Sequence, residues 1–313
     1  MNESSRGTWA VLGAALLWGT TGTAATFAPR GSSSWAIGAA AMGIGGIAMF
    51  LGARRAAAHL ITSGGAGRTL WLSAGFVVAY PLAFYTSMSD AGVAIGVTLS
   101  IGAAPIAAAL IERFRHGRPL SRGWAATVAI AIIGATLLGT GRVDLVHHGA
   151  LQELTGMILA LVAACCYAGY SVAASEIIAE GAGSRATVGA LFGLASVVLI
   201  PVLLITGPAL LSNPRGIVVA GYLGLIPMTL GYVLFGHGLR TTPASDATML
   251  SLLEPAVAAV LAALIAHQHL SEPGWLGIGL VLASVLLQAR SSRPRARRPP
   301  VPAEPALAPR ASS

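Results

Sequence analysis

Long, uninterrupted stretches of apolar residues recur along almost the whole chain, and they restrict the possible folds more than any other feature. A helix needs about 20 consecutive apolar residues to cross the hydrocarbon core of a bilayer. The chain has 313 residues, of which 55% are hydrophobic and only 10% are charged, whereas a soluble domain has roughly 25% charged residues. Because so few charges cannot cover a surface in water, a soluble enzyme, a fibrous protein and a disordered chain are excluded. We expect an all-α polytopic membrane protein, since the alternating segments of about 10 residues that a membrane β-barrel needs are missing from the sequence.

Arginines, prolines and polar clusters divide the apolar sequence into ten segments, and each is expected to form one membrane helix. The connections are short, which indicates antiparallel neighbours. The residues after Arg290 are rich in proline and arginine and have no apolar face to bury, so they are expected to form a disordered tail. The ten segments lie near residues 8–28, 33–53, 69–89, 91–112, 121–140, 153–175, 186–206, 216–239, 242–266 and 273–290.

The positions of the arginines predict the orientation in the membrane, because cytoplasmic loops carry an excess of basic residues. With the N-terminus inside, only Arg30, Arg142 and Arg215 fall on the outer side. An odd number of helices would place the loop after the second segment and the tail on opposite sides and would abolish this bias. We therefore expect a multi-pass protein of the cell membrane (plasma or inner) with both termini in the cytoplasm, and this topology explains the net charge of +8 better than nucleic-acid binding does. The cytoplasmic arginines are Arg6, Arg54, Arg55, Arg68, Arg113, Arg115, Arg118, Arg122, Arg185, Arg240 and those of the tail.

The second half of the chain repeats features of the first at an offset of about 150 residues. Pro105 falls on Pro255, and Gly123-Trp124 falls on Gly274-Trp275 after one inserted residue. Each half holds five segments, an odd number, so the second half enters the membrane from the opposite side and the halves are inverted repeats. Secondary transporters commonly have this architecture, with the substrate site between the halves near the midplane. The expected divisions are a first repeat over 1–140, a connecting loop over 141–152, a second repeat over 153–290 and a cytoplasmic tail over 291–313.

Several motifs resemble those of the EamA-domain transporters of the drug/metabolite transporter superfamily. The most specific is Leu250-Ser251-Leu252-Leu253-Glu254-Pro255, which looks like the family's Leu-Glu-Pro helix. The resemblance runs from about residue 7 to residue 289 and implies ten helices in two EamA repeats that export or import small metabolites such as amino acids. The chain departs from the family at three places. Arg118 and Gln268 stand near positions where a glutamate is common, and Ala104 is the first-half counterpart of Glu254.

Glu254 lies near the middle of the ninth segment and is followed by a proline. A carboxylate at that depth is costly, so it is a functional candidate by default, and burial disfavours its charged form. Pro255, like Pro105 in the fourth segment, cannot donate a backbone hydrogen bond and is expected to break its helix. Two interpretations of Glu254 are open. It is a proton-coupling group or a contact for a substrate amine, or else it bonds to a neighbouring helix and repairs the break.

Aromatic and hydroxyl residues recur on the first, third, fourth, sixth, eighth and ninth segments. Polar tips in lipid must find partners, so these six segments are expected to line a central cavity while the other four pack peripherally. The alternative for any single residue is interior packing without substrate contact. The substrate or coupling candidates are Glu254, Trp18, Thr21, Tyr80, Tyr167, Tyr170, Ser171, Tyr232, Thr248 and Ser251.

The remaining polar residues indicate neither a metal site nor a cofactor. The histidine pairs lack the ligand spacing of a metal centre and are expected in surface loops, and the two adjacent cysteines are expected to be small core residues. Phosphate-binding motifs are missing from the sequence, which argues against an ATP-driven pump. These residues are His147, His148, His267, His269, Cys165 and Cys166.

We therefore predict a secondary transporter, and a proton-driven exporter of small metabolites is favoured over an importer or a lipid-carrier flippase. The expected partners are a small-molecule substrate, the lipid bilayer and protons, but not nucleic acid. An intramembrane enzyme is the alternative from a different class, and Asp246 with Glu254 or Ser251 with His237 are its candidate pairs. Asp246 is otherwise interpreted as a capping residue of the ninth segment.

Overall fold

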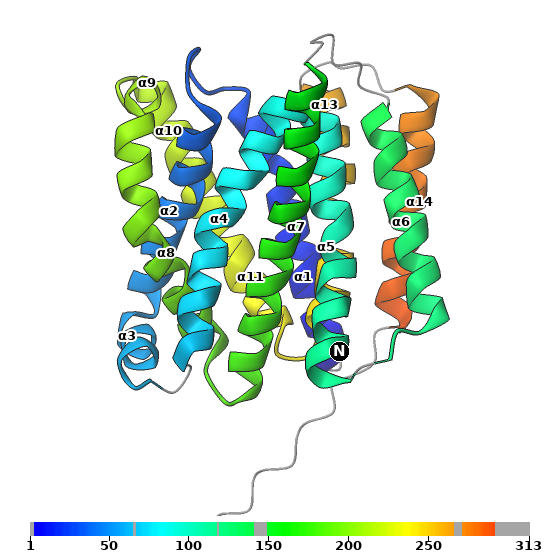
Figure 1. Ribbon diagram of the computed structural model, residues 1–313, viewed down its shortest axis with the longest axis horizontal. Coiled ribbons are helices and arrows are strands. Elements are labelled where there is room, and N and C mark those ends of the chain that lie inside the picture. The colour runs from blue at the N-terminus through cyan, green and yellow to red at the C-terminus, as the bar shows by residue number, and fades with distance from the viewer. Residues whose placement is uncertain (1–2, 65–66, 118, 141–148, 266–270, 292–313) are drawn as a thin grey trace, which may run out of the picture.

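The computed structural model describes residues 3–64, 67–117, 119–140, 149–265 and 271–291, and these residues form helices without strands. Figure 1 shows the long helices side by side in one bundle. The helices are α1 (Glu3–Ala25), α2 (Ser34–Gly52), α3 (Arg54–Thr62), α4 (Gly67–Ala91), α5 (Val93–His116), α6 (Arg122–Thr140), α7 (Ala150–Ala179), α8 (Ser184–Thr206), α9 (Pro208–Leu211), α10 (Pro214–Leu223), the π-helix η1 (Gly224–Leu230), α11 (Gly231–Gly238), α12 (Ala244–Leu250), α13 (Leu253–Ile265) and α14 (Glu272–Ser291).

Every predicted membrane segment coincides with one of these helices or with a consecutive group of them. Within the described ranges, nine helical stretches are long and apolar enough to cross a membrane. The stretch α10–η1–α11 counts as one of these, and so does α12–α13. Helix α1 is not among the nine, because it is less apolar and carries several threonines and glycines, yet it packs inside the bundle against α11 and α13. The protein is therefore an all-α membrane protein, as predicted.

Some sequence predictions fall outside the described residues. These concern the tail from residue 292 onward, the loop residues 141–148, which include one arginine expected on the outer side, the arginine and the glutamine near the positions where the family carries a glutamate, and the histidine pairs. The individual residues are Arg118, Arg142, His147, His148, His267, Gln268 and His269.

Local sequence explains where several helices begin and end. The Ser33 hydroxyl accepts a hydrogen bond from the Ala36 amide at 3.0 Å and caps α2. Asn213 caps α10 in the same way, with its side-chain oxygen 2.8 Å from the Arg215 amide and Pro214 in the first turn. Gly117 ends α5 in the left-handed conformation with φ of 64°, which glycine adopts without strain. These residues determine where α2 and α10 begin and where α5 ends.

The ninth predicted helix is interrupted, although not in the manner that its proline indicated. Helix α12 ends at Leu250 and α13 begins at Leu253, so the interruption lies at Ser251 and Leu252. Pro255 is in the first turn of α13, where its missing N–H is not needed. Pro105 lies inside α5, which continues without interruption, so the predicted break there is wrong. A proline removes one hydrogen bond of a long helix, and in membrane helices neighbouring groups compensate for that loss.

Two further elements lie within predicted spans or loops. The short helix α3 occupies the predicted connection between the second and third segments, with Ala57 buried and Arg54 and Arg55 exposed. The π-helix η1 lies in the middle of the eighth predicted segment and contains Pro227. π-helical turns inside α-helices occur frequently at functional sites. This one packs against α2 and α1.

The contacts between helices remain the same when the first five predicted spans are exchanged with the last five. Helix α2 packs on its counterpart α8, and α6 packs on its counterpart α14. The pair α4 with α7 corresponds to α11 with α1, and the pair α5 with α7 corresponds to α13 with α1. Figure 1 shows α6 and α14 together at one edge of the bundle and α2 and α8 near the other. The two halves therefore interlock rather than form separate bundles.

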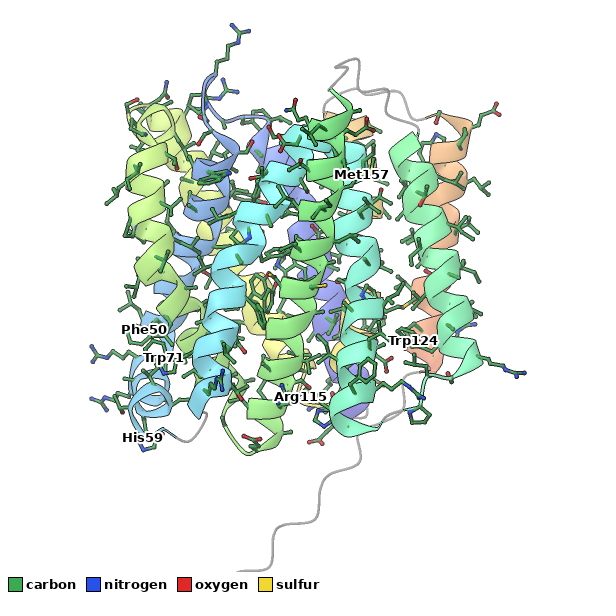
Figure 2. All side chains as sticks on the ribbon, viewed as in Figure 1. Phe50, His59, Trp71, Arg115, Trp124 and Met157 are labelled. Atoms are coloured by element: carbon green, nitrogen blue, oxygen red, sulfur yellow. The ribbon has the colours of Figure 1, made fainter. Side chains whose placement is uncertain are left out.

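The ends of the bundle can be followed in Figure 2. His59, Trp71 and Arg115 lie at the end where Figure 1 marks the N-terminus, and Met157 lies toward the opposite end. Since Met157 is near the start of α7 and α1 starts at the other end, these two counterpart helices run in opposite directions.

Candidate functional site

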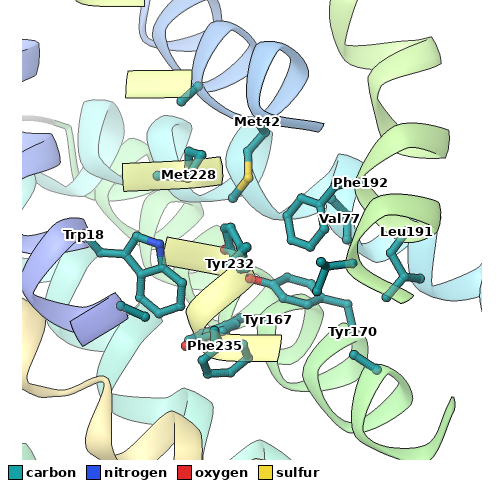
Figure 3. Packing of buried hydrophobic residues seen from close by; sticks show 14 of the residues in the cluster. Trp18, Met42, Val77, Tyr167, Tyr170, Leu191, Phe192, Met228, Tyr232 and Phe235 are labelled. Carbon is teal, nitrogen blue, oxygen red and sulfur yellow. Dashed lines mark hydrogen bonds between the residues drawn. The ribbon is translucent and has the colours of Figure 1, made fainter. Parts of the chain in front are cut away.

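A cluster of aromatic side chains occupies the core between the two halves (Figure 3). The Trp18 ring on α1 lies 4.8 Å from the Tyr232 ring on α11 and 6.3 Å from the Tyr167 ring on α7. Tyr80 of α4 approaches Tyr167 to 5.7 Å between ring centroids. Because α1 and α4 belong to the first half and α7 and α11 to the second, the cluster joins the halves at their centre.

Hydrogen bonds fix the orientation of the tyrosines in this cluster. The Tyr170 and Tyr232 hydroxyls are 2.7 Å apart and share a hydrogen bond. The Tyr167 hydroxyl donates to Ser251 Oγ at 3.0 Å, and Ser251 Oγ donates to the Thr248 carbonyl oxygen at 2.7 Å. Ser251 lies at the interruption between α12 and α13. The interruption therefore supplies the acceptor that fixes the orientation of Tyr167.

Glu254 is the second residue of α13, the helix that begins directly after that interruption. Its amide donates to the Ser251 carbonyl oxygen at 2.9 Å, which starts the helix again. Its carboxyl group borders a cavity and forms no hydrogen bond with any residue that the structure describes. Among these residues the Glu254 carboxyl group therefore has no hydrogen-bond partner on a neighbouring helix with which it could repair the helix break.

The cavity beside Glu254 is small and lies between the halves. It measures about 30 Å³, whereas sites for drug-sized ligands measure roughly 300–1,000 Å³ and a single water needs roughly 10–15 Å³. In this conformation it admits only water-sized molecules, so binding of a metabolite requires its walls to move apart. The lining residues are Trp18, Thr21, Ala41, Met42, Tyr80, Pro81, Phe84, Tyr85, Tyr167, Met228, Tyr232 and Glu254.

Six of the ten candidates from the sequence line this cavity: Trp18, Thr21, Tyr80, Tyr167, Tyr232 and Glu254. The other four candidates do not line the cavity. Tyr170 and Ser251 hydrogen-bond to lining tyrosines, and the Thr248 hydroxyl bonds to the Ala244 carbonyl oxygen of its own helix at 2.8 Å. The Ser171 hydroxyl is buried without a hydrogen-bond partner among the described residues.

The structure corrects the expected choice of lining helices. Helix α2 was expected to be peripheral but contributes Ala41 and Met42 to the wall. Helix α5 was expected to line the cavity, yet none of its described residues does so, and its Ser100 is buried elsewhere. The expectation relied on polar side chains, and alanine and methionine carry no such signal. Methionine is nevertheless common at adaptable binding surfaces because it is flexible and polarisable.

At the end of the bundle where the N-terminus lies, two glutamates of opposite halves tie the halves together. Glu112 of α5 is only 5% exposed. It accepts hydrogen bonds from the Ala244 amide at 2.9 Å and from Ser245 Oγ at 2.6 Å, so it caps α12 from across the interface. Glu176 of α7 pairs with Arg115 at 3.2 Å and with His116 at 2.9 Å.

A second cavity of about 190 Å³ adjoins Glu112 at this end. Asp246 also borders it and lies in the first turn of α12, where a negative charge is favourable, whereas the N-cap position itself is Pro243. Glu112 itself was not among the sequence candidates, because it precedes Arg113 and resembles an ordinary loop anchor. Among the described residues no group of three or more side chains could hold a metal. Cys166 is buried as expected, whereas Cys165 is exposed on the outside of α7.

Comparisons with known proteins agree with this architecture. Residues 5–140 and 154–290 match the EamA-like transporter family. The chain is 34% identical over 284 residues to the uncharacterized transporter YwfM of Bacillus subtilis, an alignment that covers 90% of this chain and 93% of YwfM. It is 29% identical over 205 residues to the threonine/homoserine exporter RhtA of Escherichia coli, covering 64% of each chain. One solved crystal structure superimposes with a TM-score of 0.72 at 18% identity over 90% of this chain and 95% of the other, and it supports the fold alone.

Proposed function

Because the chain belongs to the EamA-like transporter family, we propose that it is a secondary active transporter that exports small metabolites, such as amino acids, across the cytoplasmic membrane. The relatives are named as transporters, and RhtA is named as an exporter of threonine and homoserine. The substrate class and the direction proposed here for this chain follow that relative's name and the site described above.

The observation that carries the proposal is the central cavity, whose walls come from both halves. Trp18, Met42 and Tyr80 stand on helices of the first half, and Tyr167 and Glu254 stand on helices of the second. A site between two halves opens to one side or the other when the halves rock against each other, which is alternating access. The small size of the cavity fits a state in which the halves have closed on each other.

We propose that the two halves are inverted five-helix repeats, with α1 as the tenth membrane helix beside the nine apolar ones. Two features support this proposal. The helix contacts persist when the halves are exchanged, and α1 and α7 run in opposite directions. The division into residues 1–140 and 153–290 follows from the same exchange, with α7 beginning at Ala150.

We also propose that both termini are cytoplasmic. Figure 2 shows His59 of α3 and Arg115 of α5 at the end of the bundle that carries the N-terminus. Arg54 and Arg55 begin α3, and Arg113 stands with Arg115 in the last turn of α5. Arg30 follows α1 and Arg215 begins α10, so these two lie toward the opposite end. This distribution is the one that the positive-inside rule associates with a cytoplasmic N-terminus.

Glu254 is the proposed coupling residue, and protons are the proposed coupling ion. It is the one carboxyl group on the cavity wall, it lies within a membrane span, and it has no hydrogen-bond partner among the described residues. A buried carboxyl group without a fixed partner can exchange a proton for a substrate group without breaking a structural contact. This arrangement favours transport driven by a proton gradient.

Import and lipid-carrier flipping use the same architecture and are the competing transport functions. The competing enzyme function has less support from the geometry. The Ser251 hydroxyl donates to the Thr248 carbonyl oxygen and accepts from Tyr167, so neither hydrogen bond pairs it with a base such as His237. Asp246 and Glu254 do not form a pair of catalytic acids either, because the two residues line different cavities.

Uptake into proteoliposomes tests the proposal. Purified protein is reconstituted, and a panel of labelled amino acids, amines and other small metabolites is offered with and without an imposed pH gradient. The proposal predicts that at least one compound accumulates only when protein and gradient are both present. No accumulation of any compound in the panel, with the protein folded in the vesicles, would contradict it. Accumulation that is equal with and without the pH gradient would contradict proton coupling.

A further inference from the structure

We infer that the central cavity selects small organic amines, which carry one positive charge on an apolar body, over amino acids with the same side chain. This inference rests on the proposed transport function, since it assumes that the cavity is the substrate site. It narrows the proposed substrates to one class of small metabolites, the singly charged amines, and places amino acids second.

The first argument is the charge of the cavity wall. Glu254 is the only acidic side chain among the lining residues, and no arginine, lysine or histidine accompanies it among the residues described. A carboxylate buried without a counter-charge is strongly destabilised and needs a proton or a cation. When the substrate occupies the cavity in place of the proton, a positive charge on the substrate meets this requirement.

The second argument is the aromatic surface around the carboxylate. Six lining side chains carry aromatic rings: Trp18, Tyr80, Phe84, Tyr85, Tyr167 and Tyr232. An ammonium group near the face of such a ring is attracted by the negative charge density of the ring, and the attraction is strongest where water is excluded. The same rings accommodate an apolar substrate body, and Met42 and Met228 can adapt to its shape.

The third argument separates amines from amino acids. An amino acid brings its own carboxylate into the cavity within a few ångströms of Glu254, where the low dielectric makes repulsion between like charges strong. In transporters a site that accepts such a group supplies an arginine or the N-terminus of a broken helix. The helix N-terminus at this wall, that of α13, already carries Glu254 in its first turn. The donors on this wall are neutral, namely the Trp18 indole N–H, which is buried without a partner among the described residues, and the hydroxyls of Thr21 and of the tyrosines. They can hydrogen-bond to a carboxylate but cannot neutralise it.

Tyr80 is the aromatic residue best suited to a test. It is half-buried, and its hydroxyl forms no hydrogen bond within the described part of the chain, whereas Tyr167 and Tyr232 are tied to their neighbours. Tyr80→Phe keeps the ring and is the matched control, and Tyr80→Leu removes the ring while leaving an apolar side chain. The two variants separate loss of the aromatic face from loss of the hydroxyl.

The experiment measures binding by isothermal titration calorimetry on the purified full-length protein in detergent. The probes are phenethylamine and phenylalanine, which differ only in the carboxylate. We expect phenethylamine to bind at least about tenfold more tightly. Glu254→Gln should abolish this preference, and Tyr80→Leu should weaken amine binding by roughly fivefold or more while Tyr80→Phe does not.

Several outcomes would overturn the inference. These are equal or tighter binding of phenylalanine, no binding of phenethylamine, a preference that persists in Glu254→Gln, or equal binding by Tyr80→Leu and Tyr80→Phe. The measurement needs no gradient, so its failure is distinct from failure of transport. Proteoliposomes that accumulate phenylalanine but exclude phenethylamine would overturn the substrate class and leave the transporter proposal standing. Proteoliposomes that accumulate no compound would overturn the transporter proposal whatever the calorimeter shows.

Discussion

Gly45 provides a test of how closely the two halves pack beside the cavity. It is buried in α2, where that helix meets η1 of the second half. A Cβ atom at this position would lie 2.8 Å from the Met228 Cβ atom and 2.9 Å from the Gly224 carbonyl oxygen. Ordinary van der Waals contact begins at 3.4 Å. Gly45→Ala therefore forces α2 and η1 apart, because a carbonyl oxygen and a Cβ atom cannot rotate away.

The cost of this substitution follows from the two contacts. Overpacking a tightly packed site typically costs about 1–3 kcal/mol. Thr229 Oγ1 also donates to the Gly224 carbonyl oxygen at 2.8 Å and approaches the Gly45 carbonyl oxygen at 3.3 Å, so the displacement strains hydrogen bonds at the same place. Replacing glycine by alanine in a helix contributes about 0.8–1 kcal/mol in the opposite direction. A control variant is needed to separate this gain in helix propensity from the packing cost.

Gly75→Ala is the matched control. Gly75 lies inside α4, and a Cβ atom there would meet no atom within 4 Å. The gain in helix propensity is the same in both variants, so the difference between them isolates the packing cost of about 1–3 kcal/mol. At about 2–4 °C per kcal/mol, Gly45→Ala should melt several degrees below Gly75→Ala.

Thermal unfolding of the detergent-purified proteins, followed by intrinsic tryptophan fluorescence, measures this difference. Gly75→Ala should melt at or slightly above the temperature of the unmodified protein. Equal melting temperatures for the two variants would show that α2 and η1 are farther apart than described. A lower temperature for Gly75→Ala would show that the exposed face of α4 is covered in the folded protein.

Three further predictions concern function and topology. Glu254→Gln keeps the shape of the side chain but removes the titrating proton, so uptake driven by a pH gradient should fall to the level without a gradient while protein abundance is unchanged; normal gradient-driven uptake by this variant would refute the coupling role. Reporter fusions after Arg142 and after Arg290 should report opposite sides of the membrane, and the inverted repeat cannot survive a result in which both report the same side. Glu112→Ala removes the cap of α12 that comes from α5 and leaves the Ala244 amide unpaired, which should destabilise the packing of α5 on α12 by about 1–3 kcal/mol. It should increase the labelling of a cysteine placed at Ser245 by a water-soluble maleimide, and unchanged labelling would rule out Glu112 as a contact that holds the two halves together at this end.

Much of the fold could be predicted because lipid leaves the chain few alternatives. A long apolar run must become a helix, since an unpaired backbone group in hydrocarbon is very costly. For the same reason the place of Glu254 within an apolar helical stretch could be predicted, and so could the inward orientation of Trp18, Tyr80, Tyr167 and Tyr232. Each of these residues carries a polar group that lipid does not satisfy.

The features that could not be predicted lack such a signal. The interruption at Ser251 and Leu252 falls within an apolar run whose composition is the same whether the helix continues or restarts. Ala41 and Met42 line the cavity because of the angle at which α2 packs, and the sequence of α2 does not predict that angle. Glu112 acts by capping a helix distant in sequence, and a partner of that kind becomes visible only when the two helices are placed together.

The presence of one carboxyl group on the cavity wall limits what the protein can accumulate. A carboxyl group binds one proton at most, so if Glu254 is the coupling group and the substrate is the singly charged amine inferred above, each cycle exchanges at most one proton for one substrate cation. Such an exchange is electrically neutral, the membrane voltage contributes nothing to it, and the concentration ratio cannot exceed about tenfold per unit of pH difference. The first-half counterpart of Glu254 is Ala104, which is fully buried. A stoichiometry of two protons, with its steeper gradient and its dependence on voltage, would require a second acidic residue that the cavity wall does not contain among the residues described.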